Sequence, residues 1–272
     1  MTPKSYIHTI GNMAVEALKF EASTTPKPGL VDRDNTGSHK DMDYAMFLAS
    51  SESLRNCFQQ CVEAGAKADQ LRTIGMEGER AMFRVTKDVN THKGLIFSMG
   101  ILCGALGEFC ANGVSFDEGD LQQLCAKLAA ELLEHDRAQD THGLAVLKKT
   151  GIKGIRGEAL SGFSSAFDIG LPALRQALAE GYPFERAMIK TLLVLMANTD
   201  DSNLVHRGGE EGLAFAKSYA KKLLDQGDFR KDEDLDLVRD FDAICIDKNL
   251  SPGGSADLLA LTAMLYLFFE EF

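Results

Sequence analysis

The sequence lacks the short signatures by which many catalytic centres are recognised. It contains no Gly-x-Ser-x-Gly elbow, no His-Glu-x-x-His pair and no heptad seam, and its glycine-rich segments do not match a Walker or dinucleotide-binding loop. These absences give no support for a serine hydrolase, a zinc peptidase of that type or a coiled coil.

Closely paired cysteines are also missing. The six cysteines mostly fall within apolar helical patterns, and none has the Cys-x-x-Cys spacing of zinc or redox sites. We therefore expect buried free thiols in a reducing cytosol.

Positive charge is scarce, because the formal net charge is -11 and the sequence pI is about 5.1. A surface that binds nucleic acid or an anionic membrane would need net positive charge on one face, so neither partner is expected. Small anionic ligands remain compatible with the composition, since they need only a local pocket.

Long apolar runs are absent as well. Met1–Ile10 has no apolar core of the kind found in a signal peptide, and the longest apolar run, Leu258–Phe269, is too short to span a bilayer. These features predict a cytoplasmic protein that does not enter a membrane.

Apolar residues do recur at helical spacing along almost the whole chain, beginning with Ile7, Ile10 and Ala14 and continuing until Pro26 closes the first helix. The spacing predicts further helices at residues 43–65, 68–87, 92–111, 117–135, 140–150, 164–180, 184–198, 209–226, 232–246 and 256–270, with no alternating strand between them. With 45% hydrophobic residues, no repeat and no linker, residues 1–272 are predicted to form a single all-α domain. We expect a multi-helix bundle whose polar cleft is formed by interhelical loops and helix N-termini.

Three of these helices carry a further indication. The glycines at positions 100, 104 and 107 form a small-residue seam that would let a neighbouring helix approach closely. The run Leu192–Ala197 is apolar all round and predicts a central helix. The long apolar C-terminal helix could belong either to the core or to the interface of a homodimer.

Five short segments interrupt the helices, and each combines Gly or Pro with charged or hydroxyl side chains. They are Thr25–Asp41, Asn90–Gly94, Gly151–Glu158, Asp200–Glu210 and Ser251–Asp257. Four of the five contain cations in spite of the acidic net charge, and carboxylates lie beside those cations. This combination predicts an anion site, and a phosphate bridged by Mg²⁺ fits it best.

The first of these segments is too long and too polar for an ordinary connection between helices. Lys27, Arg33 and His39 could bind phosphate there, and Asp41 could bind a metal. A solvated loop in which Asp41 or Asp43 caps the next helix is the alternative that needs no ligand.

The second and third segments give weaker indications. Asn90–Gly94 opens a helix, whose free amides and dipole could meet an anion beside His92 and Lys93, although a plain N-cap explains half of the pattern. Gly151–Glu158 spaces its glycines every third residue around Arg156, and a simple interhelical connector is an equally good explanation.

The fourth segment follows directly on the apolar run. Asp201, Asn203 and Arg207 together resemble a metal ligand, a hydrogen-bonding partner and a phosphate fork. Carboxylates at such a helix end are well placed to bind a metal.

The fifth segment opens the last helix with Gly253, Gly254 and Ser255, and Asp257 lies in the first turn. An anion-binding helix N-terminus and a plain N-cap at Ser255 account for this pattern about equally well.

Taken together, several strings resemble the triphosphoribosyl-dephospho-coenzyme A synthase family. They are TPKPGLVDRDNTGSHKDMD, VNTHKG, GIRGEA, DSN followed by RGG, and LSPGGSADLL, which occur in the family's order from the first helix to the last. Three departures from the family pattern are Asp88 in place of a Gly, Ser202 in place of a Thr, and the additional acid Asp200. None of them removes a cation from the motifs.

The resemblance implies transfer of the triphosphoribosyl part of ATP to the ribose 2′-hydroxyl of 3′-dephospho-coenzyme A, with release of adenine. It also implies that the product is the precursor of the prosthetic group on the acyl carrier subunit of citrate lyase or malonate decarboxylase. ATP and 3′-dephospho-coenzyme A are therefore the expected partners, and Mg²⁺ is the expected cofactor.

This chemistry builds positive charge on the ribose, so the site needs a carboxylate near C1′, a donor for adenine and a base for the attacking hydroxyl. We predict that Asp41, Asp201 and Glu158 are catalytic and that Asp41, Asp201 and Asp257 bind the metal. The residues predicted to bind substrate are Lys27, Arg33, His39, His92, Lys93, Arg156, Asn203, Arg207, Gly253, Gly254 and Ser255.

Two other functions fit the same residues. A metal-dependent nucleotide phosphohydrolase would use the same acids and cations, and the dipeptide His135-Asp136, together with His92, is compatible with the scattered ligands of such enzymes. A non-catalytic regulatory protein that binds coenzyme A derivatives would show binding without turnover. The products formed from ATP separate these three functions.

Overall fold

The computed structural model describes residues 3–134 and 154–271, and this part of the chain contains helices and their connections but no strand. The predicted all-α fold is therefore confirmed. The predicted helix at 140–150 and the dipeptide His135-Asp136 lie outside the described residues.

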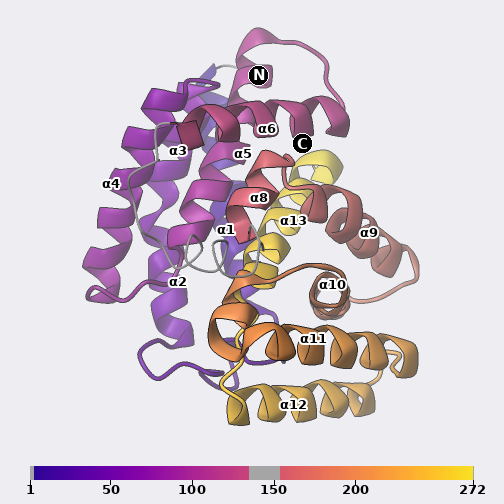
Figure 1. Ribbon diagram of the computed structural model, residues 1–272. Helices are drawn as coiled ribbons and strands as arrows, with labels where there is room; N and C mark the ends of the chain where they lie inside the picture. The colour runs from indigo at the N-terminus through magenta and orange to yellow at the C-terminus, as the bar shows by residue number, and fades with distance from the viewer. Residues whose placement is uncertain (1–2, 135–153, 272) are drawn as a thin grey trace.

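The N-terminal part of the chain forms a group of helices that run side by side (Figure 1). They are α1 (Pro3–Ser23), α2 (Tyr44–Ser53), α3 (Arg55–Ala64), α4 (Ala68–Thr86) and α5 (Lys93–Asn112). The helix α3 packs against both α1 and α5, so it lies inside this group.

The middle of the chain crosses this group. It contains α6 (Glu118–Glu134), α8 (Gly154–Leu160), a π-helix η1 (Ser165–Gly170), α9 (Leu171–Ala179) and α10 (Phe184–Asn198). The helix α6 packs on α5, and α10 packs on α9 and η1.

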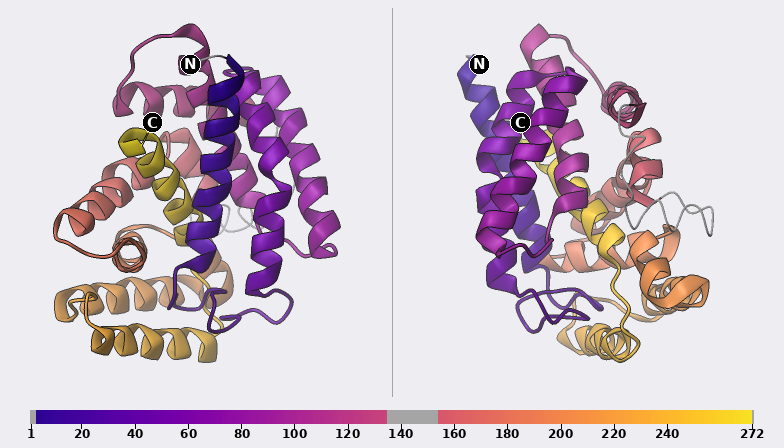
Figure 2. Two further views of the ribbon diagram at one scale, coloured as in Figure 1. Left: turned by 180° about the vertical axis from the view of Figure 1, so that it is seen from behind. Right: turned by 60° about the vertical axis from the view of Figure 1, so that its left-hand side comes forward.

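The last three helices join the two groups. The helices α11 (Ser202–Gln226) and α12 (Asp232–Asp247) lie next to each other at the lower end of the molecule in both figures, and α13 (Gly253–Glu271) rises from there through the centre (Figure 2). Because α13 contacts α1, η1, α9, α10 and α5, it belongs to the core.

The glycine seam of α5 lets this helix lie deep in the protein. Nearly every residue of Leu95–Gly107 is buried, and a Cβ at Gly107 would lie only 2.0 Å from the carbonyl oxygen of Val62 in α3. By length and composition α5 could cross a membrane, but 67% of its most apolar window is buried inside the protein, as in a core helix.

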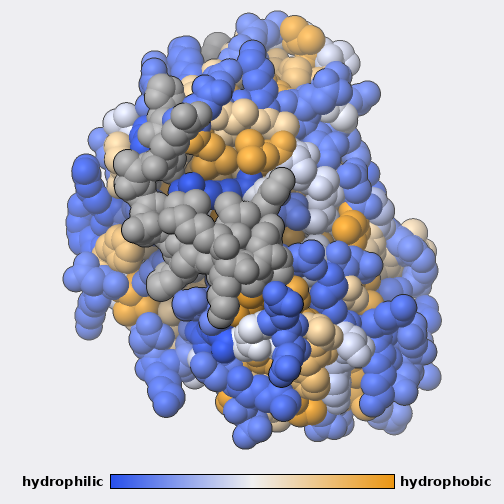
Figure 3. Space-filling model, viewed as in Figure 1, coloured by the Kyte–Doolittle hydropathy of each residue, from blue (hydrophilic) through white to orange (hydrophobic). Residues whose placement is uncertain are grey.

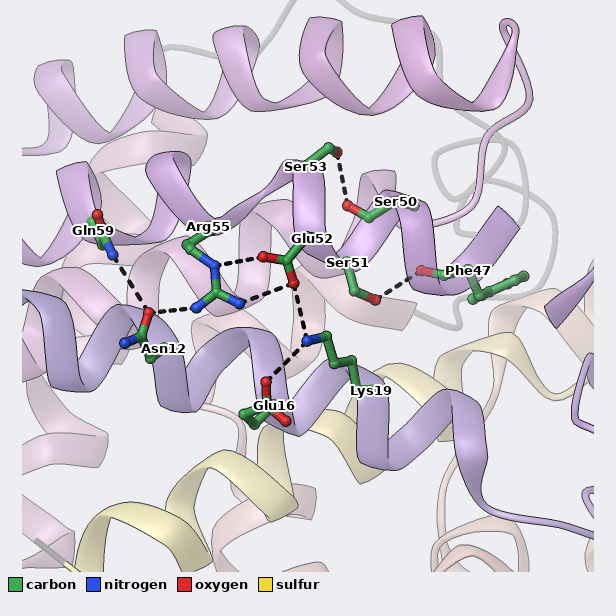
Figure 4. A network of polar contacts seen from close by, with 10 residues as sticks. All are labelled: Asn12, Glu16, Lys19, Phe47, Ser50, Ser51, Glu52, Ser53, Arg55 and Gln59. Carbon is green, nitrogen blue, oxygen red and sulfur yellow. Dashed lines mark hydrogen bonds and ion pairs between the residues drawn. The ribbon is translucent and has the colours of Figure 1, made fainter. Parts of the chain in front are cut away.

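The predicted helix 43–65 is wrong in one respect, because the structure divides it at Leu54 into α2 and α3. The hydroxyls of Ser51 and Ser53 donate to the carbonyls of Phe47 and Ser50 (Figure 4), and such bonds compete with regular helical geometry. The buried Leu54 then ends one helix and begins the next.

The same junction is tied to α1 by side chains. Glu52 of α2 forms ion pairs with Lys19 of α1 at 3.0 Å and with Arg55 of α3 at 2.7 Å, and Arg55 also donates to Asn12 of α1 (Figure 4). The two short helices therefore keep a fixed position against α1.

Three other boundaries differ from the prediction. The helix α11 begins at Ser202 rather than near residue 209, and its non-helical residue Gly209 (φ 66°, ψ -169°) marks the predicted start as a kink. The helix α8 begins inside the third polar segment. The predicted helix 164–180 starts as a π-helix and continues as α9.

Gly107→Ala should lower the free energy of unfolding by about 3 kcal/mol, because the new methyl group collides with the backbone of α3. Urea denaturation measures this change.

Gly75→Ala in α4 is the matched control, since a Cβ at this position meets nothing within 4 Å. This substitution should raise stability by about 0.5–1 kcal/mol through helix propensity. Equal effects of the two substitutions would contradict the close packing of α5 on α3.

Candidate active site

A single cavity of about 1030 Å³ brings together residues from all five polar segments. Its lining includes Lys27 and His39 from the first segment, His92 and Lys93 from the second, Arg156 and Glu158 from the third, Asp201, Asn203 and Arg207 from the fourth, and Gly253, Gly254 and Asp257 from the fifth. Figure 3 shows a mainly hydrophilic surface on which some apolar side chains gather in patches.

Three long helices direct their N-terminal ends at the cavity. They are α5, α11 and α13, whose first residues lie in the lining. The backbone amides at the start of a helix have no acceptor within that helix, and the helix dipole adds partial positive charge there. The amides of Gly94, Gly253 and Gly254 are therefore suited to an anionic ligand.

Glycine is required where these helix ends meet. A Cβ at Gly253 would lie 2.6 Å from the side-chain amide of Asn203, and one at Gly254 would lie 3.0 Å from Asp201 Oδ1. The absence of side chains at the start of α13 thus lets it lie directly against the start of α11.

Asp201 holds this helix junction together. Its Oδ1 accepts from the amides of Asn203 and Leu204 at 2.8 and 3.3 Å, and its Oδ2 accepts from the amide and hydroxyl of Ser255 at 2.8 and 3.0 Å. Burial raises the pKa of Asp201, and these four hydrogen bonds oppose that increase. A carboxylate accepts about four hydrogen bonds, so both oxygens are fully used.

The floor of the cavity contains a buried ion pair that joins α1 to the first polar segment. Lys27 Nζ donates to the Glu21 carboxylate at 2.5 Å and to the Glu21 carbonyl at 2.9 Å, and both residues line the cavity. The side chain of Lys27 is only 1% exposed. Burial of such a pair is expensive unless both partners remain, so removal of either charge would destabilise the floor.

The first polar segment is folded around two buried carboxylates. Asp32 accepts from the amides of Lys27, Asp34 and Asn35, which closes a compact turn. Asp242 of α12 accepts from the amide of Gly29 and from the side chain of Asn35, both at 2.8 Å. The segment is therefore a fixed wall rather than a free loop.

His39 and Arg207 form one corner of this wall. Arg207 donates to the carbonyl of Ser38 at 2.9 Å and to the side chain of Asn249 at 3.0 Å, and it lies 3.2 Å from His39 Nδ1. Burial and the charge of Arg207 lower the pKa of His39. The neutral ring can accept from Arg207 through Nδ1 and donate through Nε2 to the hydroxyl of Ser251, 2.9 Å away.

Most carboxylates of the lining are already bonded to a neighbour. Glu158 accepts from the hydroxyl and amide of Ser165 at 2.7 and 3.2 Å, Asp200 pairs with Lys217 at 2.7 Å, and Glu79 pairs with Lys93 at 3.1 Å. These bonds fix side-chain positions but leave fewer oxygens for a ligand.

Asp257 is the exception. Within residues 3–134 and 154–271, no hydrogen bond or ion pair reaches its carboxylate. A Cβ at Gly94 would lie 2.8 Å from its Oδ2, which places the carboxylate beside the start of α5. Burial raises the pKa of Asp257 well above its ordinary value, and the nearby carboxylates of Glu21 and Asp201 add to this effect.

Most of the predicted site residues line the cavity, but three of them do not. Arg33 lies outside the lining, half-exposed and paired with Glu185 at 3.0 Å. Asp41 is exposed and also outside the lining, although its charge acts on the pKa of His39. Ser255 does not line the cavity, and its hydroxyl donates to the carboxylate of Asp201.

Sequence analysis did not assign several residues that line the cavity. Glu21 lies three residues after Leu18 and four after Ala17, which puts it on the apolar stripe of α1 and would have indicated a buried charge. His206 also lines the cavity. The aromatic lining includes Phe47, Phe83 and Phe97, to which no role was assigned from the sequence.

The donor set is compatible with Mg²⁺ only when substrate supplies the remaining ligands. No group of three or more His, Cys, Asp or Glu side chains within the described ranges could hold a metal. Mg²⁺ is commonly bound through one or two carboxylates together with phosphate oxygens and water. The unbonded carboxylate of Asp257 fits this arrangement.

Asp201→Ala should lower the free energy of unfolding by about 2–4 kcal/mol, because it removes a helix cap and leaves the buried amide of Ser255 without its acceptor. Asp200→Ala is the control, since Asp200 is 62% exposed and should cost less than about 0.5 kcal/mol. Chemical denaturation of both variants tests this. Similar midpoints would show that Asp201 does not hold the junction.

Comparison with known proteins shows the family to which the chain is related. The chain matches the family described as "CitG: ATP:dephospho-CoA triphosphoribosyl transferase" over residues 7–272. It is 43% identical over 275 residues to the "2-(5''-triphosphoribosyl)-3'-dephosphocoenzyme-A synthase" of Pectobacterium atrosepticum, covering 96% of this chain and 90% of that protein. A Vibrio cholerae serotype O1 protein with the same name, prefixed "Probable", is 41% identical over 278 residues, covering 97% of this chain and 89% of that protein.

No solved structure matches the chain. The family match and these relatives extend over nearly all of the sequence. The chain belongs to the ATP:dephospho-CoA triphosphoribosyl transferase family.

Proposed function

We propose that this protein transfers the triphosphoribosyl group of ATP to the ribose 2′-hydroxyl of 3′-dephospho-coenzyme A and releases adenine. The observation that carries the proposal is the convergence of all five polar segments, which contain the family-like strings, on one cavity. A cavity of about 1030 Å³ lies at the upper end of the usual range for ligand pockets, which suits large nucleotide substrates.

Phosphate groups are expected at the junction of α11 and α13. The amides of Gly253 and Gly254 are available there, and Arg207 supplies a guanidinium held in place by backbone and side-chain acceptors. Arg156 and Lys93 extend the positive charge along the lining. This arrangement concentrates positive potential locally although the protein as a whole is acidic.

Asp257 is the carboxylate best suited to hold Mg²⁺ against the triphosphate, because its oxygens are not bonded to other described groups. When bound, Mg²⁺ would offset the charge of the phosphate oxygens. The carboxylate of Asp257 lies beside the start of α5. A negative charge there can also stabilise the positive charge that develops at C1′ of the ribose.

The hydrogen bonds of the other acids bear on their proposed roles. Since both oxygens of Asp201 are used by helix amides and Ser255, we assign it to positioning. Glu158 retains some capacity to accept hydrogen bonds and lines the cavity, so it is a better candidate for the base that accepts the hydroxyl proton. Asp41 does not line the cavity, so we assign it no direct role in the reaction.

We further propose that the product is the precursor of the prosthetic group on the acyl carrier subunit of citrate lyase or malonate decarboxylase. The sequence resemblance supports this assignment. Incubation of the product with each apo carrier and its transfer enzyme, followed by intact-protein mass spectrometry, would identify the system that is served.

Purified protein incubated with ATP, Mg²⁺ and 3′-dephospho-coenzyme A should form free adenine and the triphosphoribosyl adduct in equal amounts. Chromatography with mass spectrometry measures both. Adenine without the adduct would indicate a glycosidase or another acceptor, and phosphate without adenine would indicate a phosphohydrolase. Binding without turnover would indicate a regulatory protein.

Asp257→Asn should reduce kcat about 100-fold or more, because the amide cannot supply the negative charge. If Asp257 holds Mg²⁺, the concentration of Mg²⁺ needed for half-maximal rate should also rise. The same substitution should leave stability at pH 7 unchanged or higher, because a carboxylate whose pKa is raised by folding is destabilising when ionised.

Asp200→Asn is the matched control, since it also replaces a carboxylate of the lining but one that is paired with Lys217. Its effect on kcat should be less than about threefold. Full activity of Asp257→Asn would remove Asp257 from the reaction.

A further inference from the structure

His92 is a buried histidine with one bonded and one unbonded nitrogen. Its side chain lies at the start of α5, is 3% exposed and lines the cavity. The nitrogen Nδ1 lies 2.7 Å from the hydroxyl oxygen of Ser50, whereas Nε2 has no hydrogen-bond partner among the described residues. Buried polar atoms without partners are uncommon in proteins and require an explanation.

A chain of hydroxyl groups favours one tautomer of this ring. Thr91 Oγ1 donates to Ser50 Oγ at 2.7 Å, so the hydroxyl hydrogen of Ser50 is available for His92 Nδ1. A neutral imidazole that accepts at Nδ1 carries its proton on Nε2. His92 therefore presents an N–H donor with nothing in the described protein to accept it.

The ring is held neutral. Burial, and secondarily the charge of Lys27, lower the pKa of His92 to about 3. The sequence suggested that His92 is one of the cations that bind phosphate. A neutral ring can donate a hydrogen bond but supplies no positive charge, so the surroundings of His92 favour a donor role over a cationic one.

Beside these hydroxyls and the charge of Lys27, His92 also has apolar and aromatic neighbours. The ring of Phe47 meets it edge-on, with 5.0 Å between centroids and an angle of 76°. The backbone amide of His92 donates to the sulfur of Met82, whose neighbour Phe83 also lines the cavity. A flat, uncharged heterocycle with a nitrogen acceptor suits this part of the cavity better than a phosphate does.

We propose that His92 donates a hydrogen bond from Nε2 to ring nitrogen N7 or N3 of the adenine that leaves ATP. This proposal rests on the transferase function proposed above. As the C1′–N9 bond breaks, its electron pair passes to adenine, and a donor already in place stabilises the charge that develops there. The acceptor hydroxyl forms the new O–C1′ bond and loses one proton while adenine takes up one, so the reaction balances without another reactant.

Ser50 is the positioning residue in this arrangement. It does not line the cavity but sets the proton of His92 on Nε2. Loss of its hydroxyl would leave Nδ1 free to carry the proton and would weaken the donor at Nε2.

The test compares ATP with 7-deaza-ATP and 3-deaza-ATP, each of which lacks one ring-nitrogen acceptor. In the wild-type protein kcat should be much higher with ATP than with one of the analogues. His92→Phe should lower kcat with ATP about 100-fold and reduce the ATP-to-analogue ratio for that analogue by a similar factor. The KM for 3′-dephospho-coenzyme A should change less than about threefold.

Ser50→Ala should show the same pattern with a smaller change, and it serves as the test if His92→Phe does not fold. His8→Phe, at an exposed position of α1, is the control and should leave both ratios unchanged. Unchanged ratios for both analogues in folded variants of His92 and Ser50 would overturn the proposal. Failure of the wild-type protein to release adenine from ATP would instead overturn the transferase function.

Discussion

The contact between the starts of α11 and α13 depends on a single buried carboxylate. Asp201 accepts hydrogen bonds from both helices, and Gly253 and Gly254 leave room for it. Two positive helix ends would otherwise face each other unfavourably, so the negative charge of Asp201 is what allows them to share one wall of the cavity. The positions of Arg207 and Asp257 follow from this junction, because each lies within two turns of it along α11 or α13.

The site also shows how an acidic protein can prepare a place for polyphosphates. The positive charge comes from helix ends and from a few anchored cations rather than from a basic surface. The first polar segment, which lines the cavity beside them, is held by the buried carboxylates of Asp32 and Asp242. A large share of the acidic residues near the cavity therefore organises the donors that face the ligand and does not oppose them.

The sequence predicted the fold class and most helices, because apolar periodicity survives in each long element. It predicted that the five polar segments form one site only because all of them combine Gly or Pro with charged or hydroxyl side chains. It could not tell Asp41 from Asp257, since each lies two or three residues after a Ser and only tertiary packing leaves Asp41 outside the lining. Glu21 was missed because one carboxylate on an apolar stripe looks like a tolerated exception until its partner Lys27 is seen. The break at Leu54 depends on serine hydroxyls that donate to backbone carbonyls. The spacing of apolar residues gives no indication of such bonds.

The first polar segment is joined to the far end of the chain. Gly29 and Asn35 bond to Asp242, and Ser38 donates to the carbonyl of Leu250, across more than 200 residues of sequence. Contacts between such distant residues form only after the intervening chain has been made and arranged. During synthesis, the first polar segment can therefore reach its final position only after α12 and Leu250 have left the ribosome. A truncated chain that ends before α12 would lack the anchors of this segment, so the proposed nucleotide site can form only in the complete fold.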